Sequence, residues 1–268
     1  MATSLRAALE DARASGIPHA SARPSVAGVW ALGRIEARRM LLHPSFLIGT
    51  AFALFIMRGA FGSGGTQMDL RENLAWVIGG ILVGVLVGTV LTTDIAAMRP
   101  RRDQTQELFG ALPAPPETRT VGVFAGLLLG PVTVSIVLTA CAWWAFRSNE
   151  NIGPHIDLFL AVQIPLTVAA LGAIGIAVGR WVPSLLGGPV VIAAHIFTGI
   201  IWAVPWVLPT ETGVDRPSHI IYLVAAITTW TALALARDRR TAPRFVIAAS
   251  AVAVGVVAAT QQLPPGGW

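Results

Sequence analysis

The sequence LAWVIGGILVGVLVGTVLTTDIAA occupies residues 74–97 and carries no charged side chain before Asp94. Spanning the hydrocarbon core of a bilayer, about 30 Å thick, takes roughly 20 mainly apolar helical residues, so this stretch is long enough to cross. Gly80, Gly84 and Gly88 recur every four residues and therefore fall on one helix face, where another backbone can approach closely. The stretch predicts a transmembrane helix that packs against a neighbour through its glycines.

Similar apolar blocks recur along the chain, in which 54% of residues are hydrophobic and only 12% are charged. This balance is typical of a membrane protein and not of a soluble one. The final block is only marginally long and crosses if flanking residues join it. We expect an all-α integral membrane protein, a bundle of six to seven transmembrane helices within residues 45–262, followed by a short tail over 263–268. The further predicted spans cover residues 45–61, 121–146, 158–178, 185–208, 220–236 and 245–260.

The chain before the first span divides into two parts. Residues 1–25 lack the apolar run of a signal peptide and are interpreted as a cytoplasmic tail. Residues 26–44 predict an amphipathic helix that lies in the membrane surface, ended by His43 and Pro44 because proline disfavours helix in the residue before it. The apolar face of this helix gathers Val26, Val29, Trp30, Gly33, Ala37, Met40 and Leu41. The residues expected at the interface are Trp30, Arg34, Glu36, Arg38 and Arg39.

Every basic residue is an arginine, and the arginines are distributed unevenly. With a cytoplasmic amino terminus, fifteen of the nineteen fall in cytoplasmic segments and four in external ones. The positive-inside rule therefore predicts a multi-pass protein of the plasma membrane with its amino terminus in the cytoplasm. An odd number of spans would place Trp268 outside.

Several kinds of chemistry are excluded by the residues that are missing. Without lysine, the chain can build neither a Walker-type phosphate loop nor a Schiff base. The single cysteine, Cys141, precludes an internal disulfide or a cysteine cluster and is expected to be a small packed residue. No His-Glu-x-x-His pattern or nucleophile elbow is present. We expect no metal site, no cofactor and no enzymatic activity in this chain itself.

Few polar residues fall inside the predicted spans. Asp94 is expected near the inner edge of its span and Asp157 at the outer edge of another. Gln163 and His195 are candidates for either an interhelical hydrogen bond or a polar contact that lines a pathway. His219 is assigned to an external loop.

The largest internal polar loop covers residues 99–120. Part of it can form a short cytoplasmic helix bounded by Pro100 and Pro113, to which a soluble partner would dock. The alternative is a solvated loop whose arginines lie near anionic lipid, and spacing alone does not separate the two. The proposed coupling residues are Asp103, Gln104, Thr105, Glu107, Leu108, Phe109 and Leu112.

Two stretches resemble the permeases of ABC-2 type transporters, especially those of actinobacteria. RIEARRMLLHPSF at residues 34–46 resembles their opening before the first span, and ELFGALPAPPETRT at residues 107–120 resembles their cytoplasmic coupling segment. Both the order and the spacing of the two motifs match this plan.

The resemblance implies the transmembrane subunit of an ATP-driven exporter. Two permease chains, identical or different, would form the pathway, and two separate ATPase subunits would bind ATP and Mg. Residues 26–42 would be the connecting helix, and residues 103–112 would lie in a cleft of the ATPase. Members of the family usually have six spans and a cytoplasmic carboxyl terminus, so the block at 245–260 is either an added span or a sign that the last third is divided wrongly.

Two other functions remain open from the sequence. One is a secondary carrier driven by an ion gradient, and the other is a membrane anchor or assembly subunit that moves nothing. The expected partners are lipid and protein, with no nucleic acid.

Overall fold

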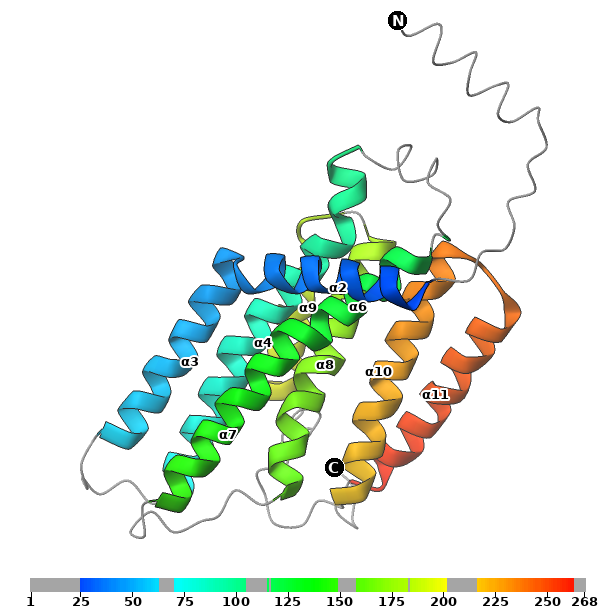
Figure 1. Ribbon diagram of the computed structural model, residues 1–268. Coiled ribbons are helices and arrows are strands. Elements are labelled where there is room, and N and C mark those ends of the chain that lie inside the picture. Colours follow the sequence, from blue (N-terminus) through cyan, green and yellow to red (C-terminus); the bar gives the residue numbers. More distant parts are fainter. Residues whose placement is uncertain are drawn as a thin grey trace, which may run out of the picture.

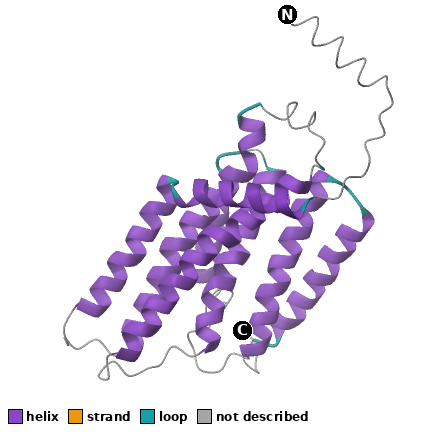
Figure 2. Ribbon diagram, viewed as in Figure 1, coloured by secondary structure: helices purple, strands orange, loops and turns teal. Residues whose placement is uncertain are grey.

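The computed structural model describes residues 25–62, 70–104, 115, 117–148, 158–182, 184–201 and 216–262, and it is all-helical over these ranges, as predicted (Figures 1 and 2). The N-terminal tail and residues 263–268 lie outside the described residues apart from Ser25. The elements are α2 (Val26–Leu41), α3 (Pro44–Gly62), α4 (Leu70–Arg102), α6 (Glu117–Leu127), the π-helix η1 (Leu128–Val132), α7 (Thr133–Ser148), α8 (Leu158–Trp181), α9 (Gly187–Ile201), α10 (Arg216–Asp238) and α11 (Ala242–Thr260).

Five helical segments are long and apolar enough to cross a membrane. A sixth results if α2 and α3, which meet at a bend of 63°, count as one broken span. The described residues therefore support five to six spans, where the sequence predicted six to seven. α9 is described over 15 residues, and residues 202–208 of the block predicted at 185–208 lie outside the described residues. The five segments are Val77–Arg102, Glu117–Ser148, Ala161–Trp181, Pro217–Asp238 and Ala242–Thr260.

The α2–α3 bend lies where the sequence predicted a break. α2 ends at Leu41 and Pro44 begins α3, a position at which proline's missing N–H costs nothing. In the bend, His43 Nδ1 accepts a hydrogen bond from the Ser45 N–H at 3.3 Å. Burial and the nearby Arg99 guanidinium lower the pKa of His43 below its usual value, which favours the neutral ring that this bond needs.

Figure 1 shows α2 lying across one end of the bundle, whereas the other helices run along it. Its buried residues are Gly33, Glu36, Ala37 and Met40. Of the predicted apolar face, Gly33, Ala37 and Met40 are thus buried against the bundle, whereas Val26 and Trp30 are exposed, and the polar Glu36 is buried. The reason is that α2 packs on α6 through a narrow strip, where an added Cβ at Gly33 would lie 2.7 Å from the Ala125 Cβ.

The glycine face of α4 packs against α3, which confirms the predicted role. A Cβ added to Gly84 would lie 2.3 Å from the Gly49 carbonyl oxygen of α3, and one added to Gly88 would lie 2.9 Å from the Phe46 Cα. A Cβ on Gly80 would likewise meet Ile56. The two helices therefore approach more closely than any side chain at these positions would allow.

The third span begins earlier than predicted, at Glu117 rather than Val121, and it contains a π-helical turn. Pro131 lies inside this turn, where its missing N–H removes one helical bond, and Thr133 Oγ1 donates to the Leu128 carbonyl at 3.0 Å. The turn is where α2 crosses the span, because Gly130 lies against Ala37.

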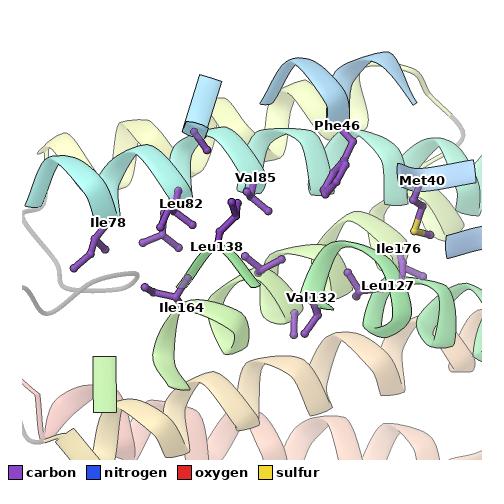
Figure 3. Packing of buried hydrophobic residues seen from close by; sticks show 14 of the residues in the cluster. Met40, Phe46, Ile78, Leu82, Val85, Leu127, Val132, Leu138, Ile164 and Ile176 are labelled. Carbon is purple, nitrogen blue, oxygen red and sulfur yellow. The ribbon is translucent and has the colours of Figure 1, made fainter. Parts of the chain in front are cut away.

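The apolar core is centred on α4 and α8. In the spanning windows of these helices 72% and 67% of residues are buried, against 11% in α11. Figure 3 shows Ile78, Leu82 and Val85 of α4 meeting Leu138 of α7 and Ile164 of α8. Many large apolar side chains outside this core are exposed, as on helices that face lipid.

Cys141 of α7 is exposed, so its predicted packing is wrong. The neighbouring residues of α7 explain the error. Val137 and Trp144, one turn on either side, are also exposed, and Cys141 therefore lies on the outward face of the helix.

Candidate functional site

Most of the described arginines fall in α2 or near helix termini at one end of the bundle. The carboxyl ends of α4, α8 and α10 meet there with the amino ends of α6 and α11, and α2 lies across them. We call it the arginine-rich end. Among the described residues, three groups of ion pairs tie its helices together.

The first group is centred on Glu36 of α2, whose side chain is only 4% exposed. One carboxylate oxygen accepts from Arg99 of α4 at 2.8 Å, and the other accepts from Arg39 of α2 at 3.2 Å. Arg99 is itself largely buried, with 24% of its side chain exposed. Separating a buried ion pair would leave an uncompensated charge inside the protein. The Arg99–Glu36 pair therefore holds α2 onto the end of α4.

The second group joins α6 to α11. Arg244 of α11 donates to the Glu117 carboxylate of α6 at 2.9 Å. The same guanidinium also donates to the carbonyl oxygens of Leu235 and Arg239 at the end of α10. Arg244 therefore fixes the α10–α11 connection against the first turn of α6.

The third group is centred on Asp238, the last residue of α10. Its carboxylate pairs with Arg180 of α8 and accepts a hydrogen bond from the Thr120 hydroxyl of α6. Asp238 is only 4% exposed and Arg180 16%. α6, α8 and α10 are thus joined at one carboxylate.

The proposed coupling segment lies between two of these anchored helix ends. Of its predicted residues, Thr105, Glu107, Leu108, Phe109 and Leu112 lie outside the described residues. The other two residues form a turn and not a helix, and Gln104 has a φ of 53°.

Pro100 does not bound a separate helix, because it lies inside α4, which continues to Arg102. Arg99, Arg101 and Arg102 therefore belong to the end of α4 and not to a loop. A proline removes only its own N–H, and the Asp103 N–H to Arg99 carbonyl bond at 2.9 Å continues the helical pattern past it.

Asp94 is buried more deeply in the fold than its place near the span edge indicated, at 1% exposure. Oδ2 accepts the Gly188 N–H of the first turn of α9 at 3.0 Å, so Asp94 caps that helix from α4. Among the described residues Oδ1 has no hydrogen-bond partner. Gly179 and Gly187 leave the space that the carboxylate fills. Two features of the sequence could have indicated this contact. One is an acidic residue within an apolar span, and the other is the Gly187–Gly188 pair at the start of a later apolar block.

The opposite end of the bundle holds a buried polar chain. His219 of α10 is fully buried, which makes its assignment to an external loop wrong. Its Nδ1 lies 2.8 Å from the Gln262 Oε1, and its Nε2 lies 3.1 Å from the Gln163 Nε2. The amide oxygen can only accept and the amide nitrogen can only donate, so His219 is neutral with its proton on Nδ1. Gln163 thus forms the interhelical hydrogen bond that was one of its two predicted roles.

His195 lies in α9, and its side chain lies outside the described residues. Its two alternative roles therefore stay predictions.

Replacing His219 with leucine is expected to lower stability by about 1–3 kcal/mol, because both buried hydrogen bonds are lost. The measurement is the thermal unfolding midpoint of the purified chain in detergent. Thr228→Val is the matched control, since within the described part of the chain the Thr228 hydroxyl donates to the Val224 carbonyl of its own helix. Equal midpoints for the two variants would contradict a stabilising role for the polar chain.

Among the described residues no group of three or more His, Cys, Asp or Glu side chains could hold a metal ion. No protein-family model matches the chain, and the comparisons with curated proteins and with solved structures give no significant match.

Proposed function

We propose that this chain is the transmembrane permease subunit of an ABC-2 type exporter. Its arginine-rich end and its amino terminus face the cytoplasm of a plasma membrane. A second permease chain completes the pathway, and separate ATPase subunits bind ATP and Mg. The observation that carries the proposal is that both helix ends flanking residues 103–116 are anchored by buried ion pairs, through Arg99–Glu36 and Arg244–Glu117. The resemblance of residues 34–46 and 107–120 to these permeases supports the same function.

The ion pairs supply a route by which movement at the segment reaches the spans. A displacement of the α4 end moves α2 through the Arg99–Glu36 pair. A displacement of the first turn of α6 acts on α11 through Glu117 and Arg244 and on α10 through Thr120 and Asp238. A partner bound to residues 103–112 would therefore move several helices together instead of bending one loop.

ATP can drive such a movement only through a difference in affinity. A ligand shifts a two-state equilibrium by the difference between its binding free energies for the two states. In this mechanism, ATP favours the closed arrangement of the ATPase pair, closure displaces residues 103–112, and the helices rearrange to open the pathway outward.

The double substitution Leu108→Asp and Phe109→Asp tests the docking segment. We expect binding of the ATPase subunit to weaken by about thirtyfold, the effect of losing roughly 2 kcal/mol at an interface hot spot. The measurements are copurification from the native membrane and partner-dependent ATPase activity.

A matched control is Leu185→Asp with Leu186→Asp. These exposed leucines lie in the turn between α8 and α9, at the same end of the bundle. Wild-type binding and ATPase activity in the Leu108 and Phe109 variant, with a folded protein, would exclude the segment as the dock.

A secondary carrier is the second candidate, and Asp94 favours it. A buried carboxylate inside a span is costly and often marks a site that binds an ion or proton. A carrier would move cargo under an ion gradient in vesicles that lack ATP, whereas the exporter would be inert in the same vesicles. An anchor or assembly subunit would bind its partner and transport nothing in either assay.

A further inference from the structure

Asp94 of α4 is a buried acid whose charge no described cation compensates. Its exposure is 1%. Other acids of the described residues with largely buried side chains each pair with an arginine: Glu36, Glu117 and Asp238. Asp94 forms no such pair with any arginine that the structure describes. Taking a carboxylate out of water without a nearby cation strongly disfavours its charged form.

Hydrogen bonds satisfy one of the two carboxyl oxygens of Asp94. Oδ2 accepts the Gly188 N–H at 3.0 Å, whereas Oδ1 has no partner among the described residues. Pro189 follows without an N–H, and the N–H groups on either side are bonded within the turn, from Gly187 to Ser184 and from Val190 to Leu186. A carboxylate is well stabilised as an anion when it accepts two or three N–H groups. One such bond and the positive end of the α9 dipole therefore replace only part of the lost hydration.

The hydroxyl groups next to Asp94 in the sequence are bonded elsewhere. Thr92 donates to the Gly88 carbonyl and Thr93 to the Thr89 carbonyl, each at 2.8 Å. Because a hydroxyl has one proton to donate, these bonds leave none for Oδ1. The residues one helical turn from Asp94 on α4 are apolar: Val90, Leu91, Ala97 and Met98. These neighbours on α4 therefore supply no donor to Oδ1.

The backbones of α8 and α9 lie against Oδ1. A Cβ added to Gly179 of α8 would lie 2.9 Å from Oδ1, and one added to Gly187 of α9 would lie 3.3 Å from it. A Cβ added to Gly188 would lie 3.2 Å from Oδ2. The carboxyl group is therefore enclosed by glycine backbone from two helices.

The charged groups of the three helices around this carboxyl have other partners or lie farther away. Arg99 of α4 pairs with Glu36, and Arg180 of α8 pairs with Asp238. The other described arginines of α4 lie at its end, at least seven positions away, or about 10 Å along the axis. The titratable residue of α9 is His195, whose side chain lies outside the described residues. No described charge therefore stabilises the anionic form of the carboxyl at close range.

We propose that Asp94 is a proton-binding site, with the proton on Oδ1 while α9 packs against α4 and α8. Protonation removes the buried charge, and Oδ2 continues to accept the Gly188 N–H. A neutral hydroxyl without an acceptor costs less to bury than an anion without a cation. A metal ion is disfavoured, because a hard cation takes about six oxygen ligands. The described residues hold no group of three or more His, Cys, Asp or Glu side chains that could bind one.

The bound proton would link Asp94 to the position of α9. Movement of the start of α9 away from α4 would remove the Gly188 bond and admit water to the carboxyl, which favours the anion and releases the proton to water. The start of α9 lies at the surface of the described bundle, since Pro189, Val190 and Ala193 are exposed. The inference does not rest on an ATPase partner and applies equally to an exporter and a carrier.

The test is infrared spectroscopy of the purified full chain, in a detergent without ester or acid groups, as the pH is lowered from alkaline to mildly acidic. A protonated carboxylic acid has a carbonyl stretching band separate from those of carboxylates and amides. The wild type should show this band while aspartates in water, with a midpoint near pH 3.9, are still ionised, and we expect its proton affinity to be at least about tenfold higher than theirs. Absence of the band under these conditions would overturn the proposal.

Asp94→Asn should remove the band, and its amide oxygen can still accept the Gly188 N–H. The matched control is Asp103→Asn, the same change at an exposed acid just after α4, which should leave the band unchanged. A band that persists in Asp94→Asn, or one that Asp103→Asn removes to the same extent, would contradict the assignment to Asp94. Circular dichroism and gel filtration verify that each variant is folded.

Isotope labelling tests the site without any variant. Aspartate labelled with carbon-13 at its side-chain carboxyl should shift the band of the wild type, so the test holds even if Asp94→Asn does not fold. An unshifted band would assign the proton to a glutamate and overturn the proposal. Sodium chloride and choline chloride at equal ionic strength should give the same band. A weaker band in sodium would show that a metal cation competes for the carboxylate, and the site would then be a cation site instead.

Discussion

Replacing Gly84 with valine is expected to force α3 and α4 apart and to cause the largest loss of stability of any single glycine substitution in α4. An added Cβ at Gly84 would lie 2.3 Å from the Gly49 carbonyl oxygen, and one at Gly49 would lie 2.1 Å from the Gly84 carbonyl oxygen. Both atoms belong to helix backbone, so neither can rotate away. Overpacking usually costs about 1–3 kcal/mol, and a clash between two backbones should reach or exceed the upper value.

Gly79→Val is the matched control, because an added Cβ at Gly79 meets nothing within 4 Å. It changes the same residue type in the same helix, five positions away, and so includes the same change in helix propensity. The thermal unfolding midpoint and the yield of monodisperse protein in detergent are the measurements. If the two variants unfold at the same temperature, the close approach of α3 and α4 does not stabilise the bundle.

Replacing Asp238 with leucine is expected to destabilise the bundle by about 3–5 kcal/mol. The substitution leaves Arg180, whose side chain is only 16% exposed, without its carboxylate. It also removes the hydrogen bond from Thr120. An uncompensated buried charge costs far more than an ion pair at the surface contributes.

The double variant Arg180→Leu with Asp238→Leu should recover most of this loss, because it removes both charges together. Arg39→Leu serves as the surface control, since the Arg39 side chain is 54% exposed and its pair with Glu36 should contribute less than about 1 kcal/mol. Adding the single variant Arg180→Leu completes a double-mutant cycle with the wild type, Asp238→Leu and the double variant, and the thermal midpoints of these proteins are compared with that of Arg39→Leu. If the double variant is less stable than Asp238→Leu alone, repulsion by an unpaired Arg180 is not the cause of the loss.

The sequence was sufficient for the features that depend on local pattern. Apolar blocks of the right length predicted the helices, and the four-residue spacing of Gly80, Gly84 and Gly88 predicted a packing face that the structure confirms. Proline at position 44 predicted the break between α2 and α3. These features follow from helix periodicity and from the length needed to cross a bilayer, which a single segment contains in full.

Span boundaries and buried polar residues were less predictable. His219 lies only three residues after Arg216, where α10 begins, so hydropathy placed it outside the span, whereas the helix continues past it into the bundle. Pro100 was taken as a helix boundary, although α4 continues through it. A hydropathy value is an average over a window of residues. It therefore does not detect a polar helix end that contacts with neighbouring helices stabilise.

By itself the sequence determined that the chain is helical and apolar and that its arginines gather toward one end. Only the tertiary structure decided the partners of the polar groups. Arg99 meets Glu36 across 63 positions of sequence, Arg244 meets Glu117 across 127, and Gln163 meets His219 across 56. The physical reason is that a helix satisfies its backbone hydrogen bonds within its own segment, whereas a buried charge or amide needs a partner that the packing of distant helices brings to it.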